Sequence, residues 1–221
     1  MARARKDTVW LDRPAWYHCT TRCVRRGYWQ GRSRVTGDDF GHRKDWIEAR
    51  LAQLAKAFAF DVAAYAVMDN HLHVVVRMDP PRTHTWSDEE VVRRWLSVHP
   101  LSRPEPELRT PDPAKVAMYL SDRQKVAQCR ENLGNLSKLI GGLKEWVARR
   151  ANKEEGCTGC YWEDRFKSQR IADPAGLLMT MVYVDLNPVR AGVVDRPEAA
   201  SHTSLPQRIE RATVDSTGQP K

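Results

Sequence analysis

The feature that most constrains the fold is a predicted β-hairpin over residues 60–78. Two runs of β-favouring residues, 60–68 and 72–78, are separated by little more than Met68-Asp69-Asn70. Aspartate and asparagine favour turns because their side chains hydrogen-bond to nearby backbone groups. A connection this short makes the two strands antiparallel neighbours, so every other element has to fit around this pair.

Further strands and helices are predicted on both sides of the hairpin. An alternating, aromatic-rich run over residues 16–24 predicts a strand. Apolar residues at helical spacing predict helices over residues 42–58 and 135–151. The other predicted elements are a glycine-containing loop over 27–41, a strand over 161–171, and a helix that Asp173 caps, that has Pro174 in its first turn and that ends near Leu186.

The order of these elements is strand, helix, strand, strand, helix, strand, helix. This order predicts an α+β fold, namely a ferredoxin-like antiparallel sheet with helices on one face. Residues 10–200 are interpreted as one domain, preceded by a basic N-terminal arm over residues 1–9. The polar segment from 201 to 221 is expected to be a flexible tail.

A proline-rich stretch over residues 79–130 interrupts the predicted domain and is interpreted as a helical insertion. Ser87, followed three residues later by Glu90, has the pattern of a capping box and predicts a helix through about Val98. A second short helix is predicted over residues 113–128.

The charge of the chain points to a polyanionic partner. The chain has 36 Lys and Arg against 28 Asp and Glu, a net charge of +8, and twelve of the basic residues fall within residues 1–50. Such a balance most often indicates nucleic acid, although a basic chain without that function is the open alternative. No membrane span and no secretory signal are apparent, so the expected compartment is the cytoplasm, in association with the nucleoid.

The cysteines do not predict structural disulfides, because their number, five, is odd and no export signal precedes them. Cys157 and Cys160 have the spacing of a zinc knuckle, and Cys19 and Cys23 could supply a second pair. The alternative interpretation is that all of them are free thiols.

Two histidines, His71 and His73, occupy alternate positions in the second strand of the hairpin. Side chains at i and i+2 of a strand point to the same face, about 7 Å apart at the Cα atoms. Two imidazoles at that separation can hold one divalent metal, and a pair of nitrogen donors suits Mg²⁺ or Mn²⁺ that a substrate phosphate also binds. The alternative is an ordinary histidine pair on the solvated face of a sheet.

A tyrosine and an asparagine share one face of the last predicted helix. Tyr183 and Asn187 are four residues apart, and helical residues at i and i+4 are neighbours. Asn187 could provide a third metal ligand, and Tyr183 could attack a phosphodiester, since a phenol becomes a useful nucleophile when a metal or a base assists it. The alternative is a packed tyrosine beside a capping asparagine.

Three segments combine these residues into a recognisable set: 65–76 (Tyr-Ala-Val-Met-Asp-Asn-His-Leu-His-Val-Val-Val), 161–168 (Tyr-Trp-Glu-Asp-Arg-Phe-Lys-Ser) and 183–192 (Tyr-Val-Asp-Leu-Asn-Pro-Val-Arg-Ala-Gly). Together they resemble the REP-associated tyrosine transposases of the single-tyrosine HUH transposase superfamily. The resemblance covers about Trp16 to Met78 and Leu133 to Thr203. The insertion between these parts does not map onto the compact core of that family.

The resemblance implies a divalent metal, cleavage of single-stranded DNA and a covalent 5′-phosphotyrosine intermediate. His71 and His73 match the metal-binding histidines of the family, Tyr183 matches the nucleophile, and Asn187 matches the polar ligand one helical turn later. Asparagine at that position is typical of the REP-associated branch, because related insertion-sequence enzymes carry glutamine there. Members of this branch are expected to act as monomers on palindromic hairpins, whereas some relatives are homodimers.

Other residues suit a role in binding a DNA hairpin. The candidate phosphate ligands are basic side chains near the motifs: Arg22, Arg25, Arg26, Arg165, Lys167 and Arg170. The candidate stacking residues are Tyr28, Trp29, Tyr161 and Trp162, for which core packing is the alternative. Arg190 is interpreted as structural.

Two non-catalytic functions are alternatives to a strand-transferase. A DNA-binding regulator on the same fold would typically have lost His71, His73 or Tyr183, and all three are present. An RNA-binding module would be expected to carry aromatic residues on its strands where this chain has histidines.

Overall fold

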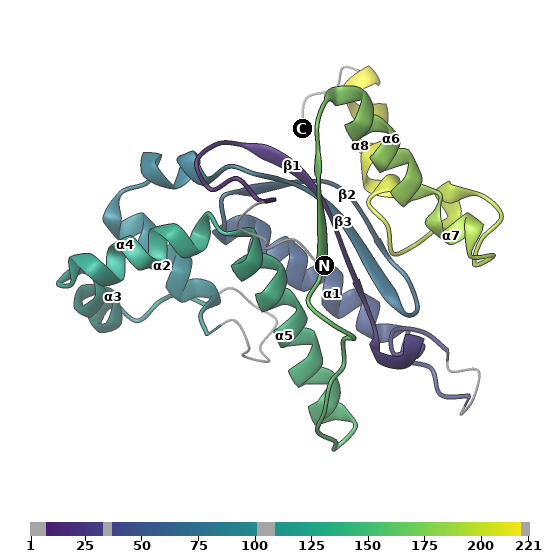
Figure 1. Cartoon of the computed structure of the whole chain (residues 1–221), viewed down its shortest axis with the longest axis horizontal. Coiled ribbons are helices and arrows are strands. Elements are labelled where there is room, and N and C mark those ends of the chain that lie inside the picture. The colour runs from purple at the N-terminus through teal and green to yellow at the C-terminus, as the bar shows by residue number, and fades with distance from the viewer. Residues whose placement is uncertain (1–7, 33–36, 101–108, 218–221) are drawn as a thin grey trace.

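A four-stranded antiparallel sheet forms the centre of the structure, a computed structural model that describes residues 8–32, 37–100 and 109–217 (Figure 1). The strand order is β2-β3-β1-β4, the order of a ferredoxin-like sheet, and the α+β class is confirmed. The strands are β1 (Ala15–Arg22), β2 (Phe60–Val67), β3 (His71–Met78) and β4 (Lys167–Ile171). The helices outside the insertion are α1 (His42–Ala57), α5 (Leu136–Glu154), α6 (Pro174–Asp185), α7 (Asn187–Arg190) and α8 (Leu205–Thr217), with short 3-10 helices η2 (Val24–Arg26) and η4 (Pro197–Ala199).

The predicted hairpin is confirmed as β2 and β3, which are joined by a tight turn. The Met68 N–H donates to the His71 carbonyl at 2.9 Å, which closes the turn. Main-chain bonds from other loops hold the turn, since Cys23 N–H donates to the Asn70 carbonyl and Gln30 N–H to the Asp69 carbonyl. The start of β3 is therefore fixed from several directions, which matters because the histidines lie there.

Helices cover both faces of the sheet, so the prediction that they lie on one face was wrong. On one face, α1 and α5 pack on the apolar side chains of β1 and β3, among them Tyr17, Leu72 and Val74. On the other face, α6 packs on β2 and β3, where Val184 joins Val75 and the small residues of β2 in a second cluster (Figure 1). The sequence does not reveal this because α6 is apolar nearly all round and so shows no single core-facing stripe.

The insertion is helical, as predicted, but its second helix is divided. It contains η3 (Pro80–Thr85), α2 (Asp88–Val98), α3 (Pro113–Leu120) and α4 (Arg123–Leu133). Ser87 caps α2, since its side chain accepts a hydrogen bond from Glu90 N–H. The predicted helix over 113–128 ends at Leu120 and a new one begins, because the Asp122 carboxylate accepts from the first N–H groups of α4 and caps it. The buried faces of α2 and α4 belong to the same core as the sheet.

The strand predicted over 161–171 is shorter than expected. Only residues 167–171 pair with β1 as β4, and Trp162 makes an isolated bridge with Cys23. Tyr161, Trp162 and Phe166 are buried, so the first part of this segment belongs to the hydrophobic core and does not extend β4. The start of α6 is confirmed: the Asp173 side chain accepts from Gly176 N–H, a cap that contributes about 1 kcal/mol.

The C-terminal segment forms a helix, whereas a flexible tail was expected. Residues 205–217 form α8, Val67 N–H donates to the His202 carbonyl, and Tyr65 N–H donates to Ser204 Oγ at 3.0 Å. Arg208 of α8 forms an ion pair with Asp185 at the end of α6. The prediction of a flexible tail was wrong for this part, because its anchors are contacts with β2 and α6 that are remote in sequence. Residues 218–221 lie outside the described ranges, as do residues 1–7 of the predicted arm, whereas Val9 is buried.

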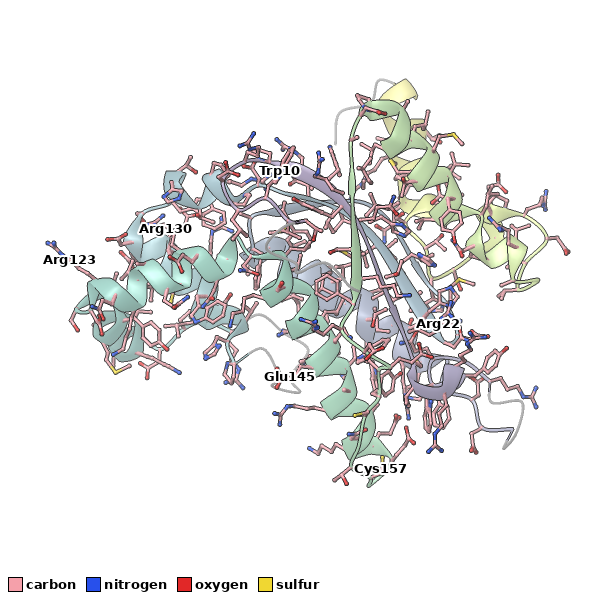
Figure 2. All side chains as sticks on the ribbon, in the orientation of Figure 1. Trp10, Arg22, Arg123, Arg130, Glu145 and Cys157 are labelled. Carbon is pink, nitrogen blue, oxygen red and sulfur yellow. The ribbon has the colours of Figure 1, made fainter. Side chains whose placement is uncertain are left out.

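None of the five cysteines forms a disulfide: Cys19, Cys23 and Cys129 are buried, and Cys157 and Cys160 are exposed. Cys157 follows α5 at its far tip (Figure 2). Within the described ranges no cysteine belongs to a cluster of potential metal ligands, so the zinc hypothesis finds no support. None of the described helices combines the length and the apolar character that crossing a membrane requires.

Candidate active site

The candidate site lies where α6 crosses the ends of β1 and β3. Side chains alternate along each strand, so while Leu72 and Val74 enter the core, His71 and His73 project toward α6. Thr20 of β1 pairs with His73, and Arg22 pairs with His71. A groove of about 550 Å³ opens at this point, and its lining includes His18, Arg22, His71, His73, Lys167 and Tyr183.

Three imidazoles gather in this groove. The ring centres of His71 and His73 are 5.0 Å apart, and the ring of His18 from β1 stacks on His73 with centres 5.1 Å apart. His18 is diagonal to His73 in the register, because His18 pairs with Val75 and Thr20 pairs with His73. The shared face predicted for His71 and His73 is present, and His18 adds a ring that the sequence analysis did not select.

Hydrogen bonds engage one nitrogen of each predicted metal ligand. His71 Nδ1 lies 2.7 Å from Asn70 Oδ1, and His73 Nδ1 lies 2.9 Å from His18 Nε2. A carboxamide oxygen only accepts, so His71 Nδ1 carries the hydrogen and His71 Nε2 keeps its lone pair. Asn70 thus determines the tautomer in which His71 can ligate a metal.

Burial makes these histidines weakly basic. It lowers the pKa of His71 to about 4 and that of His73 to about 3, and it also lowers the pKa of His18. The positive charge of Arg22 acts in the same direction on His71 and His73. The imidazoles are therefore neutral at pH 7, the state in which histidine binds a metal.

The last turn of α6 brings Tyr183 over the histidines. Its ring centre is 5.7 Å from that of His73 and 6.1 Å from that of His18, and 41% of the residue is exposed. Asn187 lies one turn later, and its Nδ2 donates to the Tyr183 carbonyl at 2.8 Å. The Asn187 side chain faces His71 and raises the pKa of His71 by stabilising the protonated ring, against the larger effect of burial. Three of the four residues selected from the sequence, His71, His73 and Tyr183, thus line one groove, and the fourth, Asn187, contacts two of them.

The predicted DNA-binding cations divide into two groups. Arg22, Arg165 and Lys167 line the groove. Arg25 and Arg26 are the last two residues of η2, both exposed and both with left-handed backbone at φ 54° and 55°. The Arg26 carbonyl accepts from Asn70 Nδ2 at 3.3 Å, so the residue that orients His71 also contacts this arginine turn.

Arg170, the sixth predicted cation, belongs to neither group and does not line the groove. It pairs with Tyr17, whose side chain is in the core on the opposite face of the sheet. Its guanidinium stacks on Trp10, 4.0 Å from the ring centre. Trp10 lies at the end of β1 remote from Arg22 (Figure 2), so Arg170 is away from the candidate site.

The aromatic residues proposed to stack on bases are mostly in the core. Tyr161 and Trp162 are buried, and the Tyr161 hydroxyl donates to the Trp29 carbonyl at 2.8 Å. Trp29 packs against the core, and Tyr28 is half-buried. Tyr161 and Trp162 therefore pack in the core, which was the alternative to stacking on bases.

Sequence reasoning missed residues that touch the site. His18, Asn70 and Arg190 were not selected, although His18 falls in the alternating run predicted as a strand. The guanidinium of Arg190 is 5.4 Å from the centre of the Tyr183 ring, because α7 turns the chain back toward the end of α6. Glu163 and Asp164 also line the groove and make part of its wall acidic.

Another cluster of potential metal ligands lies outside the groove. Asp45, Glu48 and His202 have ligand atoms within 4.8 Å of one another. His202 Nε2 lies 3.0 Å from Asp45 Oδ1, so this contact is already explained as a hydrogen bond that joins α1 to the C-terminal segment. Nothing further about these groups indicates a bound cation.

Comparison with known proteins gives one structural likeness. No protein-family model and no curated protein matches the sequence. A solved structure of a REP-associated tyrosine transposase bound to a REP hairpin matches with a TM-score of 0.56, over 96% of this chain and 87% of that chain. The chain has the fold of that transposase. At 12% sequence identity the likeness concerns the fold, so the role of the groove has to be argued from its own residues.

Proposed function

We propose that this chain is a metal-dependent DNA strand-transferase of the tyrosine transposase type, acting on single-stranded or hairpin DNA. The observation that carries the proposal is the meeting of Tyr183 with His71 and His73 in one groove, with Asn187 in contact with Tyr183 and His71. A partly exposed tyrosine beside two neutral, hydrogen-bonded histidines is unusual for a structural cluster. Buried histidines that only support the fold commonly have hydrogen-bond partners but no exposed nucleophile nearby.

The donor set suits Mg²⁺ or Mn²⁺. His71 offers Nε2, since its Nδ1 is engaged by Asn70. Asn187 offers Oδ1, since its Nδ2 donates to the Tyr183 carbonyl. Two imidazole nitrogens, the second from His73, and one amide oxygen leave positions for phosphate and water, which both cations accept. Such a metal, when bound, would polarise the scissile phosphate.

The protein's own part in the reaction is nucleophilic. The Tyr183 hydroxyl loses its proton and its oxygen forms a bond to phosphorus, the bond from phosphorus to the 3′ oxygen breaks, and the 3′ oxygen takes up a proton, so no proton is gained or lost overall. The product is a 5′-phosphotyrosine and a free 3′-hydroxyl. Because the aryl phosphate conserves the bond energy, attack by another 3′-hydroxyl can reverse the step and join strands.

The cations around the groove suit the backbone of a nucleic acid. Arg22, Arg165 and Lys167 line it, and Arg25 and Arg26 are exposed in η2, where the Arg26 carbonyl accepts from the Asn70 side chain. Positive side chains of this kind contact phosphates without reading sequence. The bound REP hairpin of the structurally similar transposase supports a palindromic hairpin as the substrate class.

A cleavage assay on single-stranded hairpin DNA with Mn²⁺ tests the proposal. The substrate is a palindrome from beside the gene, and the products are separated on a denaturing gel. The wild-type protein should give a covalent protein–DNA adduct, and both Tyr183→Phe and the metal-free reaction should give none.

The controls distinguish the competing functions. Tyr183→Phe should bind the hairpin as tightly as wild type, because the substitution removes only one exposed hydroxyl. Tight binding by both proteins without an adduct from either would favour the DNA-binding regulator. Cleavage that persists in Tyr183→Phe would rule out this tyrosine as the nucleophile.

A further inference from the structure

We infer that His18 is a positioning residue for the proposed metal site: its Nε2 accepts the Nδ1 hydrogen of His73 and so leaves His73 Nε2 free to bind the metal. The inference rests on the proposed function and adds a residue to it. It also makes a claim about the tautomer of His73 that can be tested without any metal.

The contact between the two rings is direct. His18 Nε2 and His73 Nδ1 are 2.9 Å apart, which is a hydrogen-bond distance, and the rings are nearly parallel, with an interplanar angle of 20°. Two neutral imidazoles at this separation must share one hydrogen between the facing nitrogens. Either His73 Nδ1 donates to His18, or His18 Nε2 donates to His73.

The proposed metal site decides between these two arrangements, since both His71 and His73 must present a nitrogen with a free lone pair. His71 Nδ1 is bound by Asn70 Oδ1 at 2.7 Å, and an amide oxygen accepts only, so His71 carries its hydrogen on Nδ1. His71 and His73 project from the same strand face two residues apart. His73 Nδ1 is already 2.9 Å from His18 Nε2, so Nε2 is the nitrogen of His73 that is left for the cation. A nitrogen that binds a metal must keep its lone pair, and the hydrogen of the neutral ring is then on the other nitrogen. His73 therefore carries its hydrogen on Nδ1 and donates it to His18.

The fold makes this assignment possible through strand order. β1 lies next to β3, and His18 is on the same face as His73, one diagonal step away in the register. A partner on the second ring nitrogen orients a metal-binding histidine, and loss of such a partner costs about 10–100-fold in metal affinity. In this site Asn70 is the partner of His71, and His18 is the partner of His73.

Nitrogen NMR tests the tautomer directly. Long-range ¹H–¹⁵N correlation spectra of the metal-free protein at pH 7 report which nitrogen of His73 carries the hydrogen. Wild type should show the hydrogen on Nδ1. In His18→Phe, which keeps ring volume but has no acceptor, His73 should move toward the hydrogen on Nε2, the form that free imidazole side chains prefer. Wild-type His73 with its hydrogen on Nε2 would overturn the inference.

Metal titration provides the second measurement, with Mn²⁺ as the probe and binding followed by calorimetry. His18→Phe should lose about 10–100-fold in affinity. His18→Gln should recover most of the loss, because the glutamine amide can accept a hydrogen bond near the position of the imidazole Nε2. Equal losses in His18→Phe and His18→Gln would contradict positioning and would indicate that His18 is itself a ligand.

Failure of the inference and failure of the proposed function give different results. If wild type has the predicted His73 tautomer but does not bind Mn²⁺, the hydrogen-bond assignment stands and the metal proposal is overturned. If wild type binds Mn²⁺ and both His18 variants bind equally well, the metal proposal stands and His18 has no positioning role. Amide NMR spectra of each variant verify that the sheet is intact.

Discussion

The side-chain amide of Asn187 is hydrogen-bonded to the main-chain carbonyl of Tyr183, with 2.8 Å between Nδ2 and the carbonyl oxygen. This bond spans the end of α6 and the start of α7, and it turns the other end of the amide, Oδ1, toward His71. The proposed nucleophile and the proposed third ligand therefore hold each other in place.

Substitutions of Asn187 should separate its two roles. Asn187→Ala loses the ligand oxygen and the helix contact, and Mn²⁺ affinity should fall by about 10–100-fold. Asn187→Asp keeps an oxygen for the metal and loses only the donor to Tyr183, a bond worth about 0.5–1.5 kcal/mol. Calorimetry should therefore find metal binding retained in Asn187→Asp, and adduct formation slowed. Equal metal affinity in wild type and Asn187→Ala would exclude Asn187 as a ligand.

The buried histidines should make stability depend on pH. Burial lowers the pKa of His73 to about 3, whereas an unfolded histidine takes up its proton near the ordinary value of about 6.5. Between these values the unfolded state binds more protons, so the free energy of unfolding falls as the pH falls below 6.5. From pH 7 to pH 5 the loss from His73 should be about 2 kcal/mol.

Urea denaturation of wild type and His73→Phe at both pH values measures this contribution, since the other ionisable groups are common to both proteins. The decrease on acidification should be smaller in the variant by about the same 2 kcal/mol. Identical decreases would mean that His73 is not buried in its neutral form.

Two basic residues of β4 provide a matched test of the DNA-binding face. Lys167 pairs with Thr20 and lines the groove, whereas Arg170 pairs with Tyr17 and stacks on Trp10. Lys167→Gln should weaken hairpin binding and reduce the slope of log affinity against log salt by about 0.7–0.9. Arg170→Gln should leave that slope unchanged. Hairpin binding by both variants, measured across a series of salt concentrations, tests this prediction. A reduced slope in Arg170→Gln and an unchanged slope in Lys167→Gln would indicate that DNA binds the other face of the sheet.

Arg190 should assist the chemical step. Its guanidinium is 5.4 Å from the Tyr183 ring, close enough to approach a phosphate that reaches the hydroxyl. Arg190→Gln should slow adduct formation by about 100-fold, the usual cost of removing one donor from a charged transition state. Arg196→Gln, an exposed arginine farther along the same segment, is the matched control and should react like wild type. Equal rates for both variants would leave Arg190 with a structural role.

The centre of the fold could be predicted from local pattern. The turn residues Asp69 and Asn70 between two β-favouring runs define the hairpin, and alternation along β3 alone predicts that His71 and His73 share a face. Asp173 followed by Pro174 marks the start of α6, and spacing of four brings Tyr183 next to Asn187. These are relationships between residues close in sequence, for which the period of the element decides the outcome.

The remaining features depend on contacts between distant segments. His18 reaches His73 only because β1 lies beside β3, and alternation within residues 16–24 does not specify the neighbour. The side of the sheet that α6 covers depends on the small residues Ala64 and Ala66 of β2, with which α6 packs. The C-terminal segment is held by main-chain contacts with β2, a strand more than 130 residues earlier in the chain. Arg170 was misassigned although alternation predicts its position: it is three residues from Lys167 in β4, and an odd spacing in a strand directs the two side chains to opposite faces.

The most direct test of the central claim is mass spectrometry of the protein–DNA adduct after digestion with nuclease and trypsin. Cleavage after Arg170 and Arg190 releases a peptide of residues 171–190, in which Tyr183 is the single tyrosine. The account predicts that this peptide carries a nucleotide joined through its 5′ phosphate to Tyr183. A nucleotide on any other residue, or cleaved DNA with a free 5′ phosphate and no adduct, would contradict it.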